Sequence, residues 1–312
     1  MNLADMASSA DSFFDSQLSV WGDARDRYEA LEHVMQREIF FGDFPVRLQC
    51  NPSRIVSTGA KVDAASISKR PCFLCRCNRP AEQMIDSAMV EGYDFLVNPF
   101  PIFKHHFTIS CVDHRHQDEV DLTTIALFAE SNPDMVAFYN GSASGASAPD
   151  HLHFQAGNID FLPLCRYVAD HIGECDERFS DIKVYRYPEL PMKFIRFSLS
   201  TTDEQSLREV LTRIDALSTD RSMRNLLMFS IEPGSVEVLL FPRRNHRPSC
   251  YYAQDESQRM ISPGAVDMAG VLILPRIDDY NALTADEISK VYAEVGVDDC
   301  ELKSMIDRLV SN

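Results

Sequence analysis

Two histidines and a glutamine alternate along one short stretch of the sequence. His151, His153 and Gln155 are separated from one another by single residues. Alternate side chains of an extended strand point to the same face, so the sequence predicts that these three converge. A neutral imidazole can attack phosphorus, and an amide can donate to a phosphate oxygen. The alternative interpretation is a half-buried strand whose histidines are merely hydrogen-bonded.

A loop of small residues comes directly before this stretch. Residues 139–150 include Asn140, Gly141, Ser142 and Ser147. The backbone N–H groups of such a loop can stabilise the charge that develops on phosphate oxygens. The loop and the histidine stretch together predict a surface that handles phosphate.

A pair of cysteines indicates a second kind of chemistry. Cys72 and Cys75 have the two-residue gap that allows both thiolates to bind one metal ion, and Cys77 is close enough to compete. A redox-active or simply buried pair is the alternative, although no βαβ pattern surrounds it as in thioredoxin-like proteins. Candidate further ligands are the histidines at positions 105, 106, 114, 116 and 151.

Basic residues are candidates to neutralise substrate phosphates. Arg54 and Lys61 lie in a segment without clear periodicity, and Arg243 with Arg244 ends a predicted strand. Exposed charges in salt bridges are the alternative interpretation. His105 and His106 follow a proline turn and are predicted to be structural or surface residues.

Composition restricts the possible roles. The chain has 312 residues, 45% of them hydrophobic, and a formal net charge of −17. An acidic surface repels polyanions, so we expect no general nucleic-acid binding. No signal-peptide pattern and no run of about 18 apolar residues is present, so a cytoplasmic protein without membrane contact is expected. Nine cysteines in a chain of this length fit reduced thiols and a metal site.

Hydrophobic periodicity predicts an α+β fold dominated by antiparallel sheet, with similar strand and helix texture in both halves. Residues 46–70 are predicted to be irregular. Thr202 is a possible cap of one helix, and Thr284 with Glu287 forms a capping box on another. The predicted helices are 11–40, 121–139, 203–217 and 284–295, and the predicted strands are 93–97, 107–112, 151–156, 194–199, 226–231, 236–241 and 271–274.

The expected organisation has three parts. Residues 1–45 form an N-terminal helical segment, residues 46–180 form the half that carries the chemistry, and residues 181–312 form a second α+β half of the same globule. We expect the two halves to share one core.

Four ordered segments give the chain a resemblance to a known family. Residues 72–75, 93–98, 109–114 and 140–155 resemble the galactose-1-phosphate uridylyltransferases, the transferase branch of the histidine-triad superfamily. The stretch from His151 to Ala156, and residues 261–270, resemble the GDP-hexose phosphorylases, including GDP-L-galactose and GDP-D-glucose phosphorylases. The whole pattern also resembles a bacterial family, common in Bacteroidales, that is described only as a domain of unknown function.

This resemblance implies a histidine-triad-like antiparallel sheet, a half-barrel with flanking helices. It makes His153 the nucleophile, with Gln155, Asn140 and the 141–147 loop donating to phosphate oxygens. Ser147 is the implied loop hydroxyl, although the uridylyltransferases have Cys-Ser where this chain has Ser147-Ala148. It also implies a structural zinc ion on four ligands, with Cys77 or His116 as alternatives to one of them: Cys72, Cys75, His114 and His151.

The implied function is a nucleotidyltransferase or phosphorylase acting on a nucleoside diphosphate sugar through a nucleotidyl-histidine. Its partners would be the nucleotide sugar and either phosphate or a sugar 1-phosphate, and related transferases are homodimers. A dinucleoside polyphosphate phosphorylase or hydrolase is a second hypothesis. A zinc-stabilised nucleotide-binding protein without turnover is a third, disfavoured because His153 and Gln155 are both present.

Overall fold

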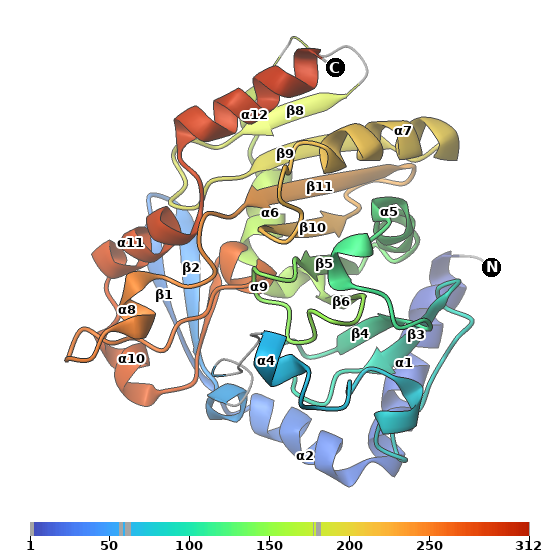
Figure 1. Cartoon of the computed structure of the whole chain (residues 1–312). Coiled ribbons are helices and arrows are strands. Elements are labelled where there is room, and N and C mark those ends of the chain that lie inside the picture. Colours follow the sequence, from blue (N-terminus) through green and yellow to red (C-terminus); the bar gives the residue numbers. More distant parts are fainter. Residues whose placement is uncertain (1–2, 56–58, 60–63, 177, 179–181, 312) are drawn as a thin grey trace.

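A nine-stranded sheet forms the body of the computed structural model, which describes residues 3–55, 59, 64–176, 178 and 182–311 (Figure 1). The strand order is β3-β4-β6-β5-β10-β11-β9-β8-β7, and every neighbouring pair is antiparallel. The expected α+β fold with an antiparallel sheet is confirmed. The strands are β3 (Tyr93–Val97), β4 (His106–Cys111), β5 (Met135–Asn140), β6 (His153–Asn158), β7 (Glu174–Cys175), β8 (Lys183–Arg186), β9 (Ile195–Ser200), β10 (Arg224–Phe229) and β11 (Ser235–Pro242).

Two similar halves build this sheet. The first half contributes β3-β4-β6-β5, and the second contributes β8-β9-β11-β10 in the corresponding order. The helix α5 (Leu122–Ser131) precedes β5 just as α7 (Glu204–Asp215) precedes β10. The halves meet where β5 pairs with β10, and this register sets Asn140 opposite Asn225. Two similar halves were expected, and the structure confirms them.

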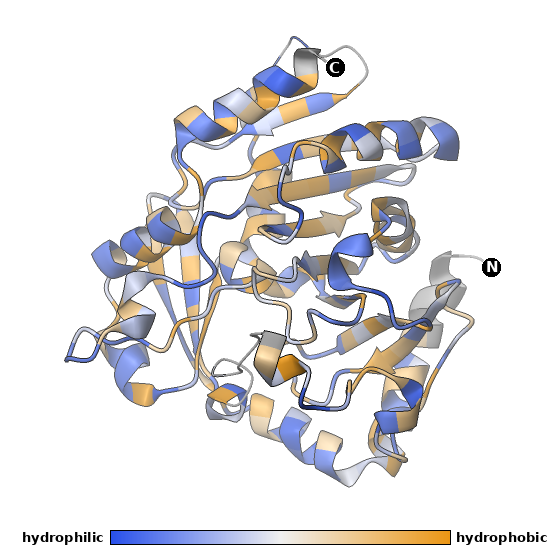
Figure 2. Ribbon diagram, viewed as in Figure 1, coloured by the Kyte–Doolittle hydropathy of each residue, from blue (hydrophilic) through white to orange (hydrophobic). Residues whose placement is uncertain are grey.

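Apolar side chains cover both faces of the sheet. On one face α5 and α7 pack together with α1 (Leu3–Val20) and α12 (Asp299–Ser311) over a core that includes Phe95, Phe154 and Ile306. The other face buries Phe103 and Phe241 beneath the remaining elements. Figure 2 shows apolar residues concentrated on the central strands and polar residues along the outer sides of α7 and α12. Burial of this apolar surface is the main stabilising term.

A small second sheet joins the two ends of the chain. It consists of β1 (Met35–Phe41), β2 (Phe44–Cys50) and β12 (Val271–Leu274). β1 and β2 form an antiparallel hairpin, and β12 pairs with β2 in parallel. In Figure 1 these N-terminal strands lie beside α10 (Ile277–Ala282) and α11 (Ala285–Val295) from the other end of the sequence.

Three predictions about local structure were wrong. The helix expected over 11–40 ends at Leu31, after α1 and α2 (Gly22–Leu31), because the following residues pair as strand β1. Residues 46–50 belong to β2 rather than to an irregular segment. The helix expected over 121–139 is α5 followed by β5, since Pro133 stops the helix.

Helix capping agrees with the sequence in one case and differs in another. The capping box of Thr284 and Glu287 on α11 is confirmed. The cap of α7 is Asp203, whose carboxylate accepts from the N–H of Gln205, and not Thr202. The shorter helices are α4 (Ala64–Ile67), α6 (Pro163–Asp170), α8 (Ser249–Tyr252) and α9 (Ala265–Met268), and the 3₁₀ turns are Pro52–Arg54, Arg76–Asn78, Gln117–Glu119 and Ile159–Phe161.

Within the described part of the chain, none of the helices combines the length and the apolar character needed to cross a membrane.

Gly157 of β6 provides a test of the packing. A Cβ at this position would lie 2.3 Å from Cγ of Phe103, whose ring is completely buried. We expect Gly157→Ala to lower the free energy of unfolding by about 1–3 kcal/mol, measured by urea denaturation, because the ring cannot move away freely. Gly22→Ala is the control, since its Cβ would meet Nη2 of Arg25 at an ordinary 3.5 Å. Equal stability of the two variants would contradict this packing.

Candidate active site

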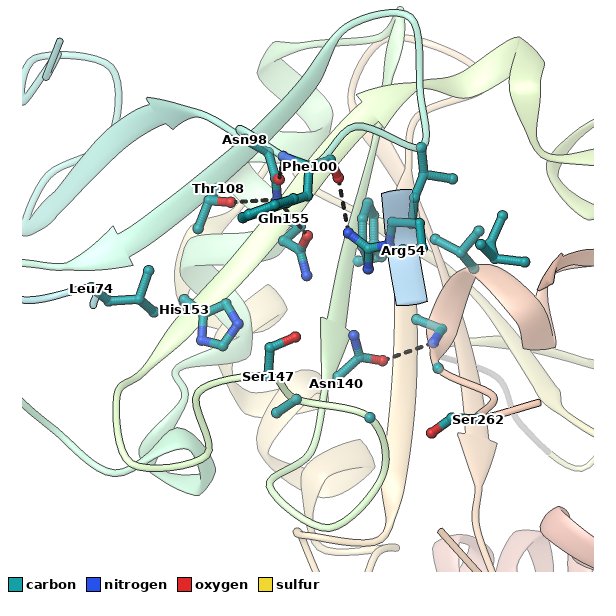
Figure 3. A pocket seen from close by; sticks show the side chains of 18 of the residues that line it. Arg54, Leu74, Asn98, Phe100, Thr108, Asn140, Ser147, His153, Gln155 and Ser262 are labelled. Carbon is teal, nitrogen blue, oxygen red and sulfur yellow. Dashed lines mark hydrogen bonds between the residues drawn. The ribbon is translucent and has the colours of Figure 1, made fainter. Parts of the chain in front are cut away.

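A cavity of about 590 Å³ lies between the first half of the sheet and the segments that follow β11. The strands β4, β5 and β6, the end of the 139–150 loop, and the start of α9 all contribute side chains to its wall. Figure 3 shows His153, Gln155, Asn140, Ser147 and Arg54 around this space. The other polar residues in the wall are Arg70, Gln83, Asn98, Thr108, His246, Arg247, Ser262 and Asp267.

His153 is the first residue of β6, and its ring lines the cavity. Nδ1 lies 2.8 Å from the carbonyl oxygen of His151. A carbonyl can only accept, so the proton sits on Nδ1 and the lone pair is on Nε2. Burial lowers the pKa of His153 to about 4. The imidazole is therefore neutral near pH 7, which is the form that acts as a nucleophile.

The amide of Gln155 has a defined orientation. Its Oε1 accepts from Nε2 of His106 at 3.0 Å and from Nδ2 of Asn98 at 3.2 Å. Both donors are oriented by backbone N–H groups: that of Ile102 donates to Nδ1 of His106, and that of Phe100 donates to Oδ1 of Asn98. The amino group of Gln155 consequently faces the cavity (Figure 3).

His106 lies inside the protein beneath the cavity and is completely buried. Burial, with a smaller contribution from the charge of Arg54, lowers the pKa of His106 to about 3. His105 and His106 were predicted to be structural or surface residues. His106 is a buried residue that supports Gln155, and Nδ1 of His105 lies 2.9 Å from Oδ1 of Asp11. What the sequence did not show is that His106 contacts Gln155.

Asn140, at the end of β5, is held in a similar way. Its Oδ1 accepts from Nδ2 of Asn225 at 2.8 Å and from the backbone N–H of Ala265 at 2.7 Å. Its amino group therefore faces the cavity (Figure 3). Two side-chain amides from neighbouring strands present donors to the space beside Nε2 of His153.

Beyond Asn140, only the later part of the 139–150 loop reaches the cavity. Gly145, Ala146 and Ser147 line it, whereas Gly141 and Ser142 do not. Gly141 packs against the backbone, where a Cβ would lie 2.4 Å from the carbonyl oxygen of Ser222. Ser142 donates to Asp118. Gly145 has a φ of 109°, which favours glycine, and brings the loop against Gly264.

The predicted cations differ in position. Arg54 lines the cavity and donates to the carbonyl oxygen of Phe100 at 2.8 Å, and burial lowers its pKa to about 10. Arg243 lies behind the wall, where its guanidinium donates to backbone carbonyls and to Asn225. Lys61 lies outside the described residues. Arg70 and Arg247 line the cavity but were not predicted as site residues. The position of Arg247, shortly after Arg243 in the sequence, was the one signal that could have indicated it.

The four predicted metal ligands come together next to His153. The donor atoms of Cys72, Cys75, His114 and His151 all lie within 4.8 Å of one another. Nδ1 of His151 is 3.3 Å from Sγ of Cys72, and Nδ1 of His114 is 3.1 Å from Sγ of Cys75. Ligand separations in a tetrahedral zinc site are roughly 3.5 Å. This cluster of two thiols and two imidazoles therefore fits a metal ion.

His151 is oriented towards this cluster by its second nitrogen. Nε2 donates to the carbonyl oxygen of Cys111 at 2.8 Å, which leaves the lone pair of Nδ1 directed at the sulfurs. His151 precedes β6, and its side chain does not line the cavity as those of His153 and Gln155 do. The prediction that all three side chains face the same surface is therefore correct for His153 and Gln155 and wrong for His151. Neither Cys77 nor His116 belongs to the cluster.

The comparisons with known proteins are consistent with this geometry. The fold is that of yeast Ap4A phosphorylase Apa2, a histidine-triad-like fold. Its complex with AMP has a TM-score of 0.60 and 15% identity over 88% of this chain and 95% of that chain. Its complex with Ap4A has a TM-score of 0.60 and 14% identity over 89% and 97% of the two chains.

Two family models together match most of the sequence. Residues 13–158 match a model described as "Domain of unknown function (DUF4922)", and residues 169–311 match one described as "GDPGP1-like, C-terminal domain". No curated protein matches the chain significantly. The fold and the C-terminal match agree with the superfamily that the sequence motifs indicated.

Burial of His106 predicts a dependence of stability on pH. In the unfolded chain a histidine takes up a proton below about 6.5, whereas folded His106 does so only near 3. Between these values the unfolded state binds more protons, so the free energy of unfolding falls as the pH falls. We expect His106→Gln to reduce this loss, measured by urea denaturation at neutral pH and near pH 5. Exposed His33→Gln is the control, and an unchanged pH dependence in His106→Gln would contradict the prediction.

Proposed function

We propose that the protein is a nucleotidyltransferase of the phosphorylase type, acting on a nucleoside diphosphate compound through His153. The observation that carries this proposal is the position of the His153 ring. Its neutral Nε2 faces a cavity in which Gln155 and Asn140 present amino groups. Such donors stabilise the negative charge of a phosphoryl group during attack.

The reaction has two displacement steps. Nε2 of His153 forms a bond to the α-phosphorus while the bond to the phosphorylated leaving group breaks. A phosphate-bearing acceptor then attacks the same phosphorus and releases the imidazole. Two in-line displacements give net retention at phosphorus and ping-pong kinetics. Ser147, beside His153 in Figure 3, would donate to the leaving group or the acceptor.

The character of the cavity wall supports a nucleotide as substrate. Apolar side chains such as Leu74, Pro80 and Leu96 line the cavity and suit a base and ribose. Arg54 and Arg247 line the cavity as well, and their charges suit the phosphates of the leaving group and acceptor. These local cations would offset the net charge of −17 of the whole chain.

We propose a nucleotide sugar as the first substrate, with inorganic phosphate or a sugar 1-phosphate as the acceptor. The match of residues 169–311 to the GDPGP1-like model supports this choice. A dinucleoside polyphosphate is the second candidate, favoured by the shared fold with a protein whose structures contain AMP and Ap4A.

Product analysis distinguishes these candidates. The protein would be incubated with GDP-, UDP- and ADP-sugars and with Ap4A, each with and without inorganic phosphate. Phosphate-dependent release of a nucleoside diphosphate from a sugar nucleotide would support the first proposal, and exchange only with a sugar 1-phosphate would indicate a transferase. Phosphate-dependent cleavage of Ap4A alone would support the second. Tight nucleotide binding without turnover of any compound would overturn the enzymatic function.

The variant His153→Ala tests the nucleophile. Turnover of the substrate found above should fall by at least about 10³-fold, because no covalent step remains. The circular dichroism spectrum should stay unchanged, since the strand β6 keeps its pairing with β4 and β5. His171→Ala, at a distant half-exposed histidine, is the control. Activity of His153→Ala within tenfold of the wild type would contradict covalent catalysis.

We further propose that Cys72, Cys75, His114 and His151 bind a structural zinc ion. A closed set of four protein ligands leaves no position for substrate, so the ion would supply stability and orientation rather than Lewis-acid catalysis. His151 links the cluster to the nucleophile, because its carbonyl oxygen accepts from Nδ1 of His153.

Removal of one thiol tests this site. Cys72→Ser should lower both the zinc content, measured by elemental analysis, and the melting temperature, because metal binding contributes to folding. Cys77→Ser is the matched control, since Cys77 is exposed and outside the cluster. Equal zinc content in the wild type and in Cys72→Ser would show that the assignment is wrong.

A further inference from the structure

A chain of hydrogen bonds runs from the second half of the protein to Asn140 in the first half. It begins at Arg243, which is buried and whose side chain can only donate. Nε donates to the carbonyl oxygen of Val295 and Nη1 to that of Pro263, and Nη1 also donates to Oδ1 of Asn225. Arg243 therefore requires the oxygen of the Asn225 amide to face it.

Asn225 in turn orients the side chain of Asn140. Its side chain is completely buried, and its Nδ2 donates to Oδ1 of Asn140 at 2.8 Å and to the carbonyl oxygen of Ser144 at 2.7 Å. Since Oδ1 of Asn225 is occupied by Arg243, only its amino group can face Asn140. The carbonyl of Ser144 accepts from the same group and excludes the flipped amide.

Asn140 is the last member of the chain. Its Oδ1 accepts from Asn225 and from the backbone N–H of Ala265. Its amino group must then point away from both donors, into the cavity beside His153. A free asparagine amide could present either its oxygen or its nitrogen to a phosphate, and only the nitrogen would attract the phosphate oxygens.

We propose that Arg243 and Asn225 are positioning residues that act through Asn140, and that they fix its amide with the amino group towards the α-phosphate of the substrate. This inference rests on the proposed function, because it assigns a role to residues behind the same site. Arg243 would thus orient the amide that binds the phosphate without contacting the phosphate itself. The second half of the sheet would contribute to the reaction through the β5–β10 pairing.

The neighbouring strand β6 carries an amide, that of Gln155, which is oriented in the same way, and this supports the inference. The oxygen of the Gln155 amide accepts from His106 and Asn98, whose own orientations are fixed by backbone N–H groups. In both series of hydrogen bonds the first group can only donate, and the last group is an amide whose amino group faces the cavity. A purely structural network has no need for this common direction.

The alternative is that the chain merely holds the two halves together. Both roles predict some loss of stability on substitution, so stability alone does not separate them. The two roles differ in how the effects of substitutions at positions 225 and 140 combine. If Asn225 acts by positioning Asn140, its substitution should have no further effect on kcat once Asn140 is absent. If Asn225 is only structural, its substitution should lower kcat in either background. A double-mutant cycle measures this difference.

The test uses Asn225→Asp, Asn140→Ala and the double variant in the full-length protein. A carboxylate at position 225 still accepts from Arg243 but cannot donate to Asn140. The substitution should turn the Asn140 amide or leave it unfixed. Loss of one such donor costs about 10²-fold in kcat. We expect Asn225→Asp and Asn140→Ala each to lower kcat by about that factor with a smaller change in KM. The double variant should stay within about threefold of Asn140→Ala.

Two further variants complete the design. Asn225→Ala removes the donor without adding charge and is used in the same cycle if the aspartate variant does not fold. Asn132→Asp is the matched control, because Asn132 is a buried amide that donates to the carbonyl oxygen of Phe128 far from the cavity. Its kcat should equal that of the wild type.

The outcomes are distinct. Turnover in the wild type with multiplied losses in the double variant would overturn the positioning role and leave the proposed function intact. An Asn225→Asp variant with unchanged kcat would overturn it as well. Absence of turnover in the wild type with every nucleotide substrate would overturn the proposed function, and the inference with it.

Discussion

The hydrogen bond from Nδ1 of His153 to the carbonyl oxygen of His151 is the interaction on which the site depends. It fixes the tautomer of His153 and so places a lone pair on Nε2, towards the cavity. His151 is in turn held by its own ring, between the carbonyl of Cys111 and the two cysteine sulfurs. The candidate metal cluster is therefore connected to His153 through the backbone of His151. None of the four cluster residues lines the cavity.

The surroundings of His153 are organised mainly by neutral donors. The oxygens of the Gln155 and Asn140 amides accept hydrogen bonds from donors on the side away from the cavity, and these donors fix the orientation of both amides. Orientation in advance matters because a donor that is already aligned costs no reorganisation when charge develops. The acidic chain places oriented amides beside His153 and cations such as Arg54 elsewhere in the same cavity.

The sequence allowed much of the site to be predicted, because its key residues lie in short ordered motifs. The four predicted metal ligands come together, and the predicted site residues His153, Gln155, Asn140 and Ser147 line one cavity. A linear pattern cannot show which way a buried guanidinium points, so Arg243 was assigned to phosphate contact rather than to a position behind Asn140. The contact of His106 with Gln155 arises from pairing between β4 and β6, which local spacing does not encode.

The fold shows the same limit. The strands of the main sheet were mostly predicted, since their apolar runs are long and bounded by turns. The hairpin of β1 and β2 was missed because β1 is an edge strand without a buried residue, so residues 35–41 carry no clear apolar alternation. Helical periodicity in α2 was extended too far along the chain for the same reason. The distant strand β12 pairs with β2 and not with β1.

The proposed mechanism requires that His153 accept a nucleoside monophosphate during turnover. Mass spectrometry after rapid acid-free quenching of the protein with its nucleotide substrate tests it most directly. Covalent catalysis predicts an added nucleoside monophosphate on the peptide that contains His153, and loss of this adduct when the acceptor is supplied. Full turnover without any adduct on that peptide, together with inversion at phosphorus, would contradict it.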